Sequence, residues 1–226
     1  MSLADDCGTS WWQKLPRAER LPLLVKLVSR FNHDLRTPLN TLTGWTHLLE
    51  RAAGDAARTQ HGAEVVARNV REQTQLLQEF TADAAALLDT LVLQPTDLAV
   101  SDLLDQALTR LAPMLALHEV SIDVVDDAPN SRINADAQHV GRLIYRLLLL
   151  AVRRAPHKAV LRPGVQRHNG SLEFALNSEA QRDGFEDLQL LDLRIASAVA
   201  QLAGGTLDVY QPAGHTHFLL RFSALH

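Results

Sequence analysis

Two segments in which apolar residues recur at steps of three and four positions dominate the first part of this chain. One runs from Leu24 to Leu49 and the other from Val66 to Leu91. This spacing returns side chains to one side of an α-helix, and a sustained repeat is typical of helices that pack along a shared seam. The sequence therefore predicts two long helices, each with a seam to bury. The seam positions are Leu24, Val28, Phe31, Leu35, Pro38, Leu42, Trp45 and Leu49 in the first helix and Val66, Val70, Gln73, Leu77, Phe80, Ala84, Leu87 and Leu91 in the second.

Short polar stretches separate and end these two helices. "RAAGDAAR", residues 51–58, interrupts the repeat with a glycine and an acidic residue, which favours a tight connection. "QPTD", residues 94–97, ends the second helix at a proline. Residues 19–94 are therefore predicted to form an antiparallel helical hairpin. Because one hairpin cannot bury both seams well, we expect two copies to meet about a two-fold axis as a dimeric four-helix bundle, which makes the chain a homodimer.

Residues 97–226 have a mixed pattern and are predicted to form a second domain. Three stretches have helical spacing: "DLLDQALTRLAPML", "DAQHVGRLIYRLLLLAVRRA" and "DLQLLDLRIASAVAQLAGG". "VSIDVV" is typical of a strand, and two hairpins are expected in "KAVLRPGVQRHNGSLEFAL", which turns at "HNG", and in "TLDVYQPAGHTHFLLRF". The fold class is therefore α+β, with the helical hairpin followed by an α/β sandwich in which helices cover one sheet.

The composition excludes several classes of function. The chain has 226 residues, 46% of them apolar, and 22 basic against 26 acidic residues, so it lacks the positive charge expected of a protein that binds nucleic acid. Its single cysteine forms no internal disulfide, and its apolar runs fall short of the roughly 20 residues of a membrane helix. We therefore predict a cytoplasmic protein that binds neither nucleic acid nor membrane. Trp11 and Trp12, in an N-terminal arm of residues 1–18, either dock on the adjacent helices or bind a partner.

The stretch "FNHDLRTPLN", residues 31–40, carries the chemistry of the first helix. Its heptad position places His33 farthest from the seam, so the imidazole is expected to face solvent, with Thr37 one turn later on the same side. A neutral imidazole has a nucleophilic nitrogen at physiological pH, and the neighbouring Asp34 can orient the ring or take its proton. Pro38 removes one helical hydrogen bond and would loosen the helix beyond the histidine. By itself, such a histidine is an ordinary surface residue, which is the interpretation given to His47 and His61.

The decapeptide and its surroundings resemble the sensor histidine kinases of two-component systems. "HDLRTPLN" is similar to their phosphoacceptor box, and "INADAQHVGRLIYRLLLLAVRRAP" and "LDLRIASAVAQLAGGTLDV" resemble helices of their nucleotide-binding domain; the likeness covers about residues 20–223. The resemblance implies that His33 accepts a phosphoryl group and that Asp34 and Thr37 assist it. It also implies that Arg36, Asn40 and Thr37 line a surface on which a partner docks.

The same resemblance implies that the second domain has lost its nucleotide site. Leu150 stands where the family has the asparagine that binds magnesium, and a hydrocarbon side chain cannot ligate this cation. The place of the family's aspartate falls at Asn177. Other residues replace its spaced glycines, and Glu186 and Asp187 add negative charge where a helix start would favour phosphate. The replaced glycines fall at Glu179, Gln181, Leu190 and Asp192.

These expectations together describe a histidine phosphotransferase with a degenerate kinase architecture. Its partners would be the receiver domains of response regulators, between whose aspartates His33 shuttles the phosphoryl group, with no cofactor of its own and with Mg²⁺ supplied by the receiver. The alternative is a pseudokinase scaffold that binds or sequesters a histidine kinase or a response regulator, in which His33 is vestigial. An active ATP-dependent kinase with displaced motifs is the third and weakest possibility.

Overall fold

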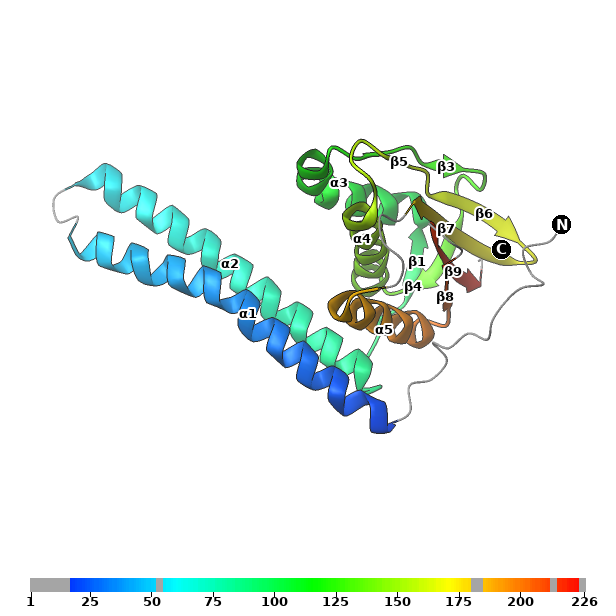
Figure 1. Ribbon diagram of the computed structural model, residues 1–226, viewed down its shortest axis with the longest axis horizontal. Coiled ribbons are helices and arrows are strands. Elements are labelled where there is room, and N and C mark those ends of the chain that lie inside the picture. The colour runs from blue at the N-terminus through cyan, green and yellow to red at the C-terminus, as the bar shows by residue number, and fades with distance from the viewer. Residues whose placement is uncertain (1–16, 52–54, 180–184, 212–214, 224–226) are drawn as a thin grey trace. The chain divides into compact units, whose positions relative to one another are not determined.

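The computed structural model describes residues 17–51, 55–179, 185–211 and 215–223, and these residues form two compact units (Figure 1). One unit is a helical hairpin that ends at Leu88, and the other is an α+β domain that starts at Asp89. The predicted N-terminal arm, with Trp11 and Trp12, lies outside the described residues except for the first residues of the first helix.

The helical unit is the predicted antiparallel hairpin of α1 (Arg17–Glu50) and α2 (Ala56–Leu87). The connection falls within residues 51–58, as predicted. Asp55 caps α2, because its carboxylate accepts a hydrogen bond from the Arg58 N–H at 3.0 Å. Near this end the helices pack closely at Gly62, where a Cβ atom would lie 2.6 Å from the Leu49 side chain.

Within a single copy, α2 buries a different set of residues from its predicted seam. Val70 and Leu77 are 50% and 54% exposed, and the residues that α2 buries lie mostly one position earlier. Two neighbouring stripes of α2 both have helical spacing, and the one buried against α1 includes the polar residues Asn69 and Asp83. Hydrogen bonds accommodate them: Asn69 Nδ2 donates to the Val65 carbonyl at 2.9 Å, and Asp83 accepts from Arg30 at 3.4 Å. The buried residues of α2 are Gly62, Val65, Asn69, Asp83, Ala86 and Leu87.

Two further details of the helix prediction are corrected. In α1, Leu27 is buried and the predicted seam residue Val28 is 44% exposed. The second helix ends at Leu87, well before the proline of "QPTD", and Asp89 adopts a left-handed backbone conformation with φ of 57°. Leu91, predicted as a seam position, therefore lies beyond the helix.

The second unit has three helices and a sheet of five strands among its described residues. The helices are α3 (Val100–His118), α4 (Ala137–Arg154) and α5 (Asp187–Leu202). The sheet has the order β3-β6-β7-β9-β8, and two short strand pairs, β1 with β4 and β2 with β5, lie beside it. The strands are β1 (Thr96–Ala99), β2 (Ser121–Ile122), β3 (Val125–Asp126), β4 (Arg132–Ala135), β5 (Val160–Leu161), β6 (Gly164–His168), β7 (Ser171–Glu179), β8 (Thr206–Tyr210) and β9 (His215–Ser223).

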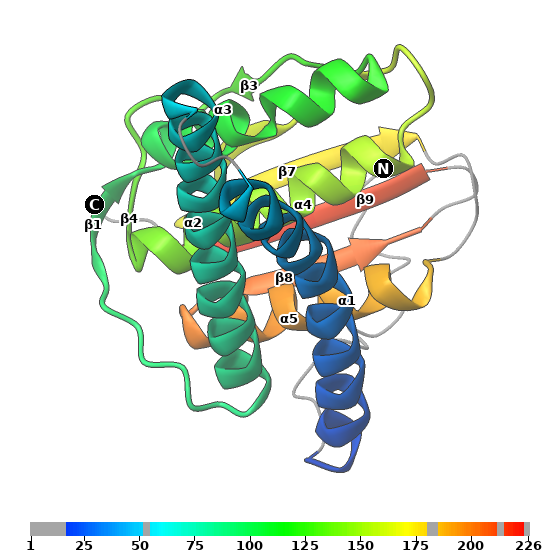
Figure 2. The same ribbon diagram turned by 90° about the vertical axis from the view of Figure 1, so that its left-hand side faces the viewer.

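The core of this unit lies between the sheet and its helices. Along β7 and β9, alternate residues such as Phe174, Leu176 and Phe218 are buried, and α4 and α5 pack on β7 and β8 (Figure 2). The predicted turn at "HNG" joins β6 to β7, with positive φ at Asn169 and Gly170. The predicted α/β sandwich is therefore confirmed, although the β1–β4 pair was not predicted and "VSIDVV" is divided between β2 and β3.

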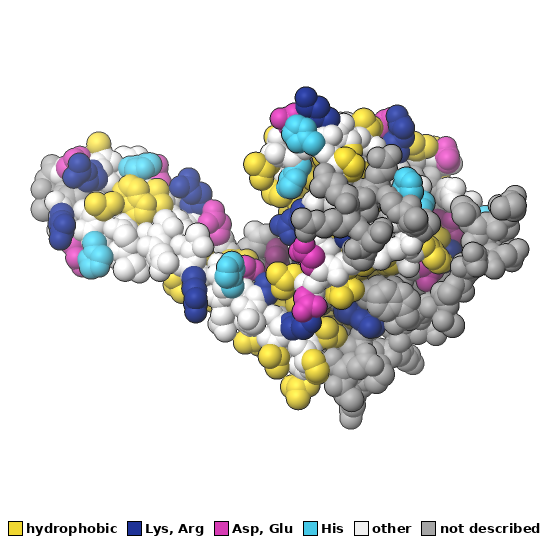
Figure 3. Space-filling model, in the orientation of Figure 1, with side chains coloured by type: hydrophobic (Ala, Val, Ile, Leu, Met, Phe, Trp, Pro, Cys, Tyr) yellow, Lys and Arg dark blue, Asp and Glu magenta, His cyan; other side chains and the backbone are white. Residues whose placement is uncertain are grey.

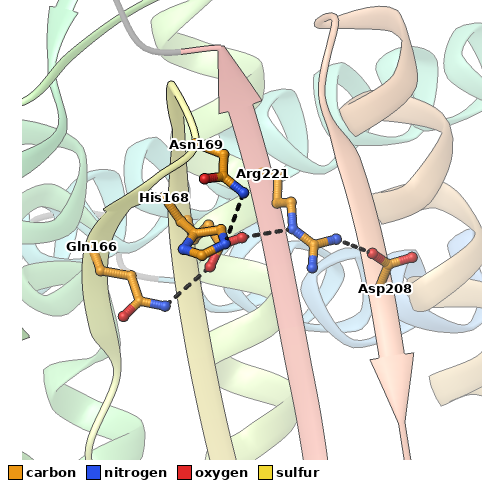
Figure 4. Close-up of polar contacts among 6 residues, drawn as sticks. Gln166, His168, Asn169, Asp208 and Arg221 are labelled. Carbon is orange, nitrogen blue, oxygen red and sulfur yellow. Dashed lines mark hydrogen bonds and ion pairs between the residues drawn. The ribbon is translucent and has the colours of Figure 1, made fainter. Parts of the chain in front are cut away.

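The face of the sheet opposite the core carries a charged network (Figure 4). Glu173 on β7 accepts hydrogen bonds from Arg221 at 2.8 Å and from Gln166 at 3.0 Å, and Arg221 also pairs with Asp208. Burial raises the pKa of Glu173, but the hydrogen bonds from Arg221 and Gln166 outweigh it, so the pKa is lowered. The network therefore joins three neighbouring strands through charged side chains.

Asp136 fixes the start of α4, and its replacement should weaken this unit in a pH-dependent way. Its carboxylate accepts from the backbone N–H groups of His139 at 3.0 Å and Gln94 at 2.8 Å. Burial raises the pKa of Asp136, but these bonds and the His139 ring outweigh it and lower the pKa below 3.8. The ionised carboxylate therefore stabilises the fold above its unfolded pKa, and this contribution is lost as pH falls through the lowered native value.

We expect Asp136→Ala to reduce the free energy of unfolding by about 1–2 kcal/mol at pH 7, the usual range for a lost N-cap. Chemical denaturation at pH 7 and at pH 3 measures this difference. The difference in free energy of unfolding between the native protein and Asp136→Ala should be smaller at pH 3 than at pH 7. An equal difference at both pH values would contradict the role given to the carboxylate charge.

None of the helices in the described part of the chain is long and apolar enough to cross a membrane.

Candidate functional site

His33 stands on the surface of α1, as its heptad position predicts. Its side chain is 84% exposed, and its Nδ1 lies 3.2 Å from the Asp34 carboxylate. If Nδ1 carries the proton that this contact favours, Nε2 keeps its lone pair and becomes the nucleophilic nitrogen. Figure 3 shows histidine and charged side chains at the surface of the hairpin. The structure thus places an accessible imidazole within hydrogen-bond distance of a carboxylate.

The remaining predicted site residues lie on the same helix and are also exposed. Arg36, Thr37 and Asn40 present their side chains to solvent within two turns of His33. The Thr37 carbonyl accepts a hydrogen bond from the Thr41 hydroxyl at 3.1 Å. The predicted residues therefore form one continuous polar stretch of α1, although their roles stay a prediction.

Pro38 lies inside α1, as the sequence predicted, and the helix continues past it to Glu50. Without an N–H group, Pro38 cannot bond the Asp34 carbonyl. One turn later, the hydroxyls of Thr41 and Thr43 bond the carbonyls of Thr37 and Leu39, a pattern that slightly destabilises helices. The helix is consequently weakened just beyond the histidine.

The second unit contains the positions at which the resemblance placed a lost nucleotide site. Leu150 on α4 is 4% exposed, so this position belongs to the core. Asp192 on α5 forms an ion pair with Arg146 on α4, with 3.7 Å between the charged atoms. α4 and α5 are therefore joined by apolar packing and by an ion pair in the region where the resemblance placed the family's nucleotide site.

A second arginine, Arg154, links three elements in the same unit. Its guanidinium donates to Gln189 of α5 at 3.0 Å and lies 3.5 Å from the Thr216 hydroxyl of β9. It also stacks over the Phe185 ring at 4.4 Å. Burial lowers the pKa of Arg154, and the nearby charge of Glu186 opposes this effect. A protein side chain thus supplies positive charge at the start of α5, beside the acidic residues Glu186 and Asp187.

The placement of Asn177 at the family's aspartate position is wrong. Strand alternation turns Leu176 toward the helices, whereas Asn177 lies on the opposite face of the sheet and bonds the His217 ring. Burial and the neighbouring His215 lower the pKa of His217. Asn177 is therefore not brought together with Leu150 and Asp192. Gln181 lies outside the described residues.

Sequence reasoning missed Arg146 and Arg154, which form polar contacts with α5 in this region. The signal available was the presence of arginines within an otherwise apolar helix, since a charged residue at a buried position needs partners. Among the described residues, no group of three or more histidine, cysteine or acidic side chains is arranged to hold a metal ion.

Comparison with known proteins extends the resemblance noted in the sequence. No family model matches the chain. Over 142 residues, or 63% of its length, the chain is 28% identical to the sensor protein DivL of Caulobacter vibrioides, of which the match covers 18%. The chain thus spans less than a fifth of this curated relative.

Solved structures show the same fold. The histidine kinase AdeS of Acinetobacter baumannii matches with a TM-score of 0.60 and 15% identity, over 84% of this chain and 97% of that one. The histidine kinase ThkA, solved in complex with the response regulator TrrA, matches with a TM-score of 0.56 and 14% identity, over 91% and 63% of the two chains. The predicted α+β class, with helices followed by a kinase-type nucleotide-binding fold, is thereby confirmed. The chain thus has the fold of the histidine kinases AdeS and ThkA and is similar in sequence to part of a sensor protein.

Proposed function

We propose that this chain is a histidine phosphotransferase of two-component signalling. His33 accepts a phosphoryl group from the aspartyl phosphate of one receiver domain and passes it to the aspartate of another. The observation that supports the proposal most is the exposed imidazole of His33, with Nδ1 held by Asp34 and Nε2 left for attack. A phosphoryl acceptor needs mainly an in-line nucleophile and correct positioning, and an exposed imidazole on a helix surface is open to the approach of a docked receiver.

The transfer is a simple exchange of bonds at phosphorus. Nε2 of His33 attacks the phosphorus atom of the aspartyl phosphate, the N–P bond forms, and the P–O bond to the aspartate breaks, releasing a carboxylate. The Nδ1 proton stays on the ring, where the charge of Asp34 stabilises the phosphorylated imidazole. In the second half of the cycle, the aspartate of another receiver attacks the same phosphorus atom, the P–O bond forms, and the N–P bond breaks to release the neutral imidazole. Mg²⁺ bound by the receiver offsets the charge on the phosphoryl oxygens.

Receiver domains are the proposed partners, and the stretch around His33 is the proposed docking surface. Arg36, Thr37 and Asn40 are exposed beside the histidine and offer charge and hydrogen bonds to an incoming protein. ThkA, which shares the fold, was solved with a response regulator bound, and this supports the choice of partner. We also propose that two copies form a four-helix bundle from their hairpins, since Val70, Leu77 and other apolar residues remain exposed on a single copy.

We propose that the second unit does not bind ATP. Buried Leu150 offers no ligand for magnesium, Asp192 is engaged by Arg146, and Arg154 is held between α4, α5 and β9. A nucleotide would have to displace these contacts and to approach the carboxylates of Glu186 and Asp187. The unit would then serve for recognition of partners rather than for catalysis.

The same observations favour one other function, that of a pseudokinase scaffold. In this alternative, the helical hairpin with its exposed apolar residues and a second unit that does not bind ATP would bind or sequester a histidine kinase or a response regulator. His33 would not accept phosphate. The two proposals differ in one respect only, which is whether phosphate passes through His33.

Labelling of the full chain distinguishes the alternatives. The purified protein is incubated with ATP labelled at the γ-phosphate, and separately with a receiver domain labelled at its aspartate, each with native protein and with His33→Gln. Label from the receiver alone, dependent on His33, supports the phosphotransferase. Label taken directly from ATP would show a kinase, and no label from either donor would favour the scaffold.

A further inference from the structure

Two histidines lie side by side on the open face of the five-stranded sheet. His215 and His217 are separated by one residue on β9, so strand alternation turns both rings toward the same face. Thr216 and Phe218, which alternate with them, are buried on the other face. His215 is exposed, His217 is partly buried, and the centroids of their rings are 6.4 Å apart. The proposed phosphotransfer makes no use of this pair.

Asn177 on β7 fixes which nitrogen of the His217 ring carries the proton. It is the residue directly opposite His217, and its side-chain oxygen lies within hydrogen-bond distance of His217 Nδ1. Because an amide oxygen only accepts hydrogen bonds, Nδ1 is the donor, and the neutral ring has its lone pair on Nε2. Histidines that bind metal ions are commonly oriented in this way, through a hydrogen bond from the second ring nitrogen to an oxygen. His217 is therefore oriented as a ligand through Nε2.

The separation of the two rings is close to the value that a shared metal ion requires. With Zn–N distances of about 2.0–2.1 Å and tetrahedral angles, two imidazoles on one Zn²⁺ have their centroids about 5 Å apart. The rings of His215 and His217 must therefore approach each other by about 1 Å. His215 is exposed, so rotation about its side-chain bonds can close this distance while His217 keeps its hydrogen bond to Asn177.

We propose that His215 and His217 together bind a transition-metal ion of the Zn²⁺ type on the open face of the sheet. Imidazole suits Zn²⁺, Cu²⁺ and Ni²⁺, whereas Mg²⁺ and Ca²⁺ prefer oxygen ligands. No third histidine, cysteine or acidic side chain of the described residues joins the pair, so water completes the coordination. Two ligands should provide about half the binding free energy of a four-ligand structural site, which corresponds to a Kd of about 1–100 μM.

The proposed metal site is independent of the proposed phosphotransfer. His33 belongs to the helical unit, whereas β7 and β9 belong to the other unit. The Mg²⁺ that a receiver domain would bring is a hard cation, for which two imidazoles are poor ligands. Loss of zinc binding would therefore leave the role of His33 untouched, and loss of phosphotransfer in His33→Gln would leave the metal site untouched.

The test is a calorimetric titration of the full chain with ZnCl₂ at neutral pH, after removal of bound metal ions with a chelator. We expect one Zn²⁺ per chain with a Kd in the micromolar range. His215→Gln and His217→Gln should each weaken binding about tenfold or more, since loss of even an outer-shell partner usually costs about 10- to 100-fold. A native protein without a micromolar site, or a site that both variants retain, would overturn the inference.

Two variants of Asn177 test how the His217 ring is oriented. Asn177→Ala removes the acceptor and should weaken zinc binding about tenfold. Asn177→Asp keeps an acceptor at this position and adds a negative charge, so it should bind Zn²⁺ at least as tightly as the native protein. Equal affinities in the native protein and both variants would contradict the orientation of His217 by Asn177.

His168→Gln is the matched control for the titration. His168 is an exposed histidine on β6 of the same sheet, and its Nε2 lies 3.0 Å from the Asn169 side-chain nitrogen. No histidine lies two residues away from it on the strand, so His168→Gln should bind Zn²⁺ as the native protein does. An equal loss in His168→Gln and His215→Gln would mean that zinc binds surface histidines in general, and would overturn the site. Thermal unfolding of each variant without zinc shows whether its fold is retained, and the exposed position of His215 makes His215→Gln the variant least able to disturb it.

Discussion

Replacement of His33 with glutamine is expected to reduce phosphoryl transfer from a phosphorylated receiver domain to the uncatalysed background, a loss of about three orders of magnitude or more. Glutamine keeps a polar side chain of similar length, but its amide nitrogen is not nucleophilic. Because the His33 side chain is 84% exposed and makes its contact with the adjacent Asp34, the fold should be unchanged. The measurement is the initial rate of label transfer from the receiver, together with the thermal unfolding of both proteins.

Two further variants make this experiment specific. His47→Gln is the matched control, because His47 is also an exposed histidine of α1 paired with an acid, Glu50, at 3.4 Å; it should transfer phosphate at the native rate. Asp34→Asn keeps the shape of the side chain but removes its charge, and should slow transfer about 10- to 100-fold. Equal loss in His47→Gln would show that the assay reports damage to α1 in general, and full activity of His33→Gln would remove the basis of the proposed function.

The position of the site could be predicted from the sequence because it depends on one helix. The exposure of His33 follows from the repeat within α1, and the order of residues in "HDLRTPLN" brings Asp34 and Thr37 beside it without any contact from a distant part of the chain. Helix starts were also predictable where a local cap exists. Asp55 and Asp136 each accept a backbone hydrogen bond at the first turn of their helix.

Features that depend on contacts between residues far apart in the chain were harder to predict from the sequence. The stripe that α2 buries could not be chosen from spacing alone, because Val65 and Val66, and likewise Leu76 and Leu77, fit two adjoining helical faces. Contacts with α1 select the buried face of α2. Arg30 of α1 pairs with Asp83, which places this polar residue on the buried side. The β1–β4 pair joins residues more than thirty positions apart, such as Leu98 and Ile133, and neither strand is long enough to show a pattern.

One residue that the resemblance assigned to the nucleotide region does not fit the fold there. The resemblance assigned Leu150 and Asn177 to the same site, but strand alternation places Asn177 on the other face of the sheet. The arginines that occupy the region, Arg146 and Arg154, were not singled out from the sequence. Their role depends on Asp192, Gln189 and Thr216, which come from α5 and β9 and are recognisable only in the fold.

Reintroduction of the missing asparagine should damage the protein rather than restore a nucleotide site. Leu150→Asn is expected to lower the free energy of unfolding of the second unit by about 3 kcal/mol, because it removes a buried apolar side chain and buries an amide that lacks partners. Leu149→Asn is the control, since Leu149 is the neighbouring residue and is only partly buried; its cost should be clearly smaller. Denaturant unfolding measures both.

Calorimetric titration of Leu150→Asn with Mg²⁺ and ATP should show no binding. The added asparagine supplies one oxygen ligand but leaves the other contacts of this region in place. Arg146 still pairs with Asp192, and Arg154 still bonds Gln189 and Thr216. A nucleotide would also meet the carboxylates at the start of α5, where attraction to the helix dipole is offset by like charge. If Leu150→Asn is stable and binds ATP, the nucleotide site is intact apart from this one residue. That result would contradict the proposal that the second unit does not bind ATP.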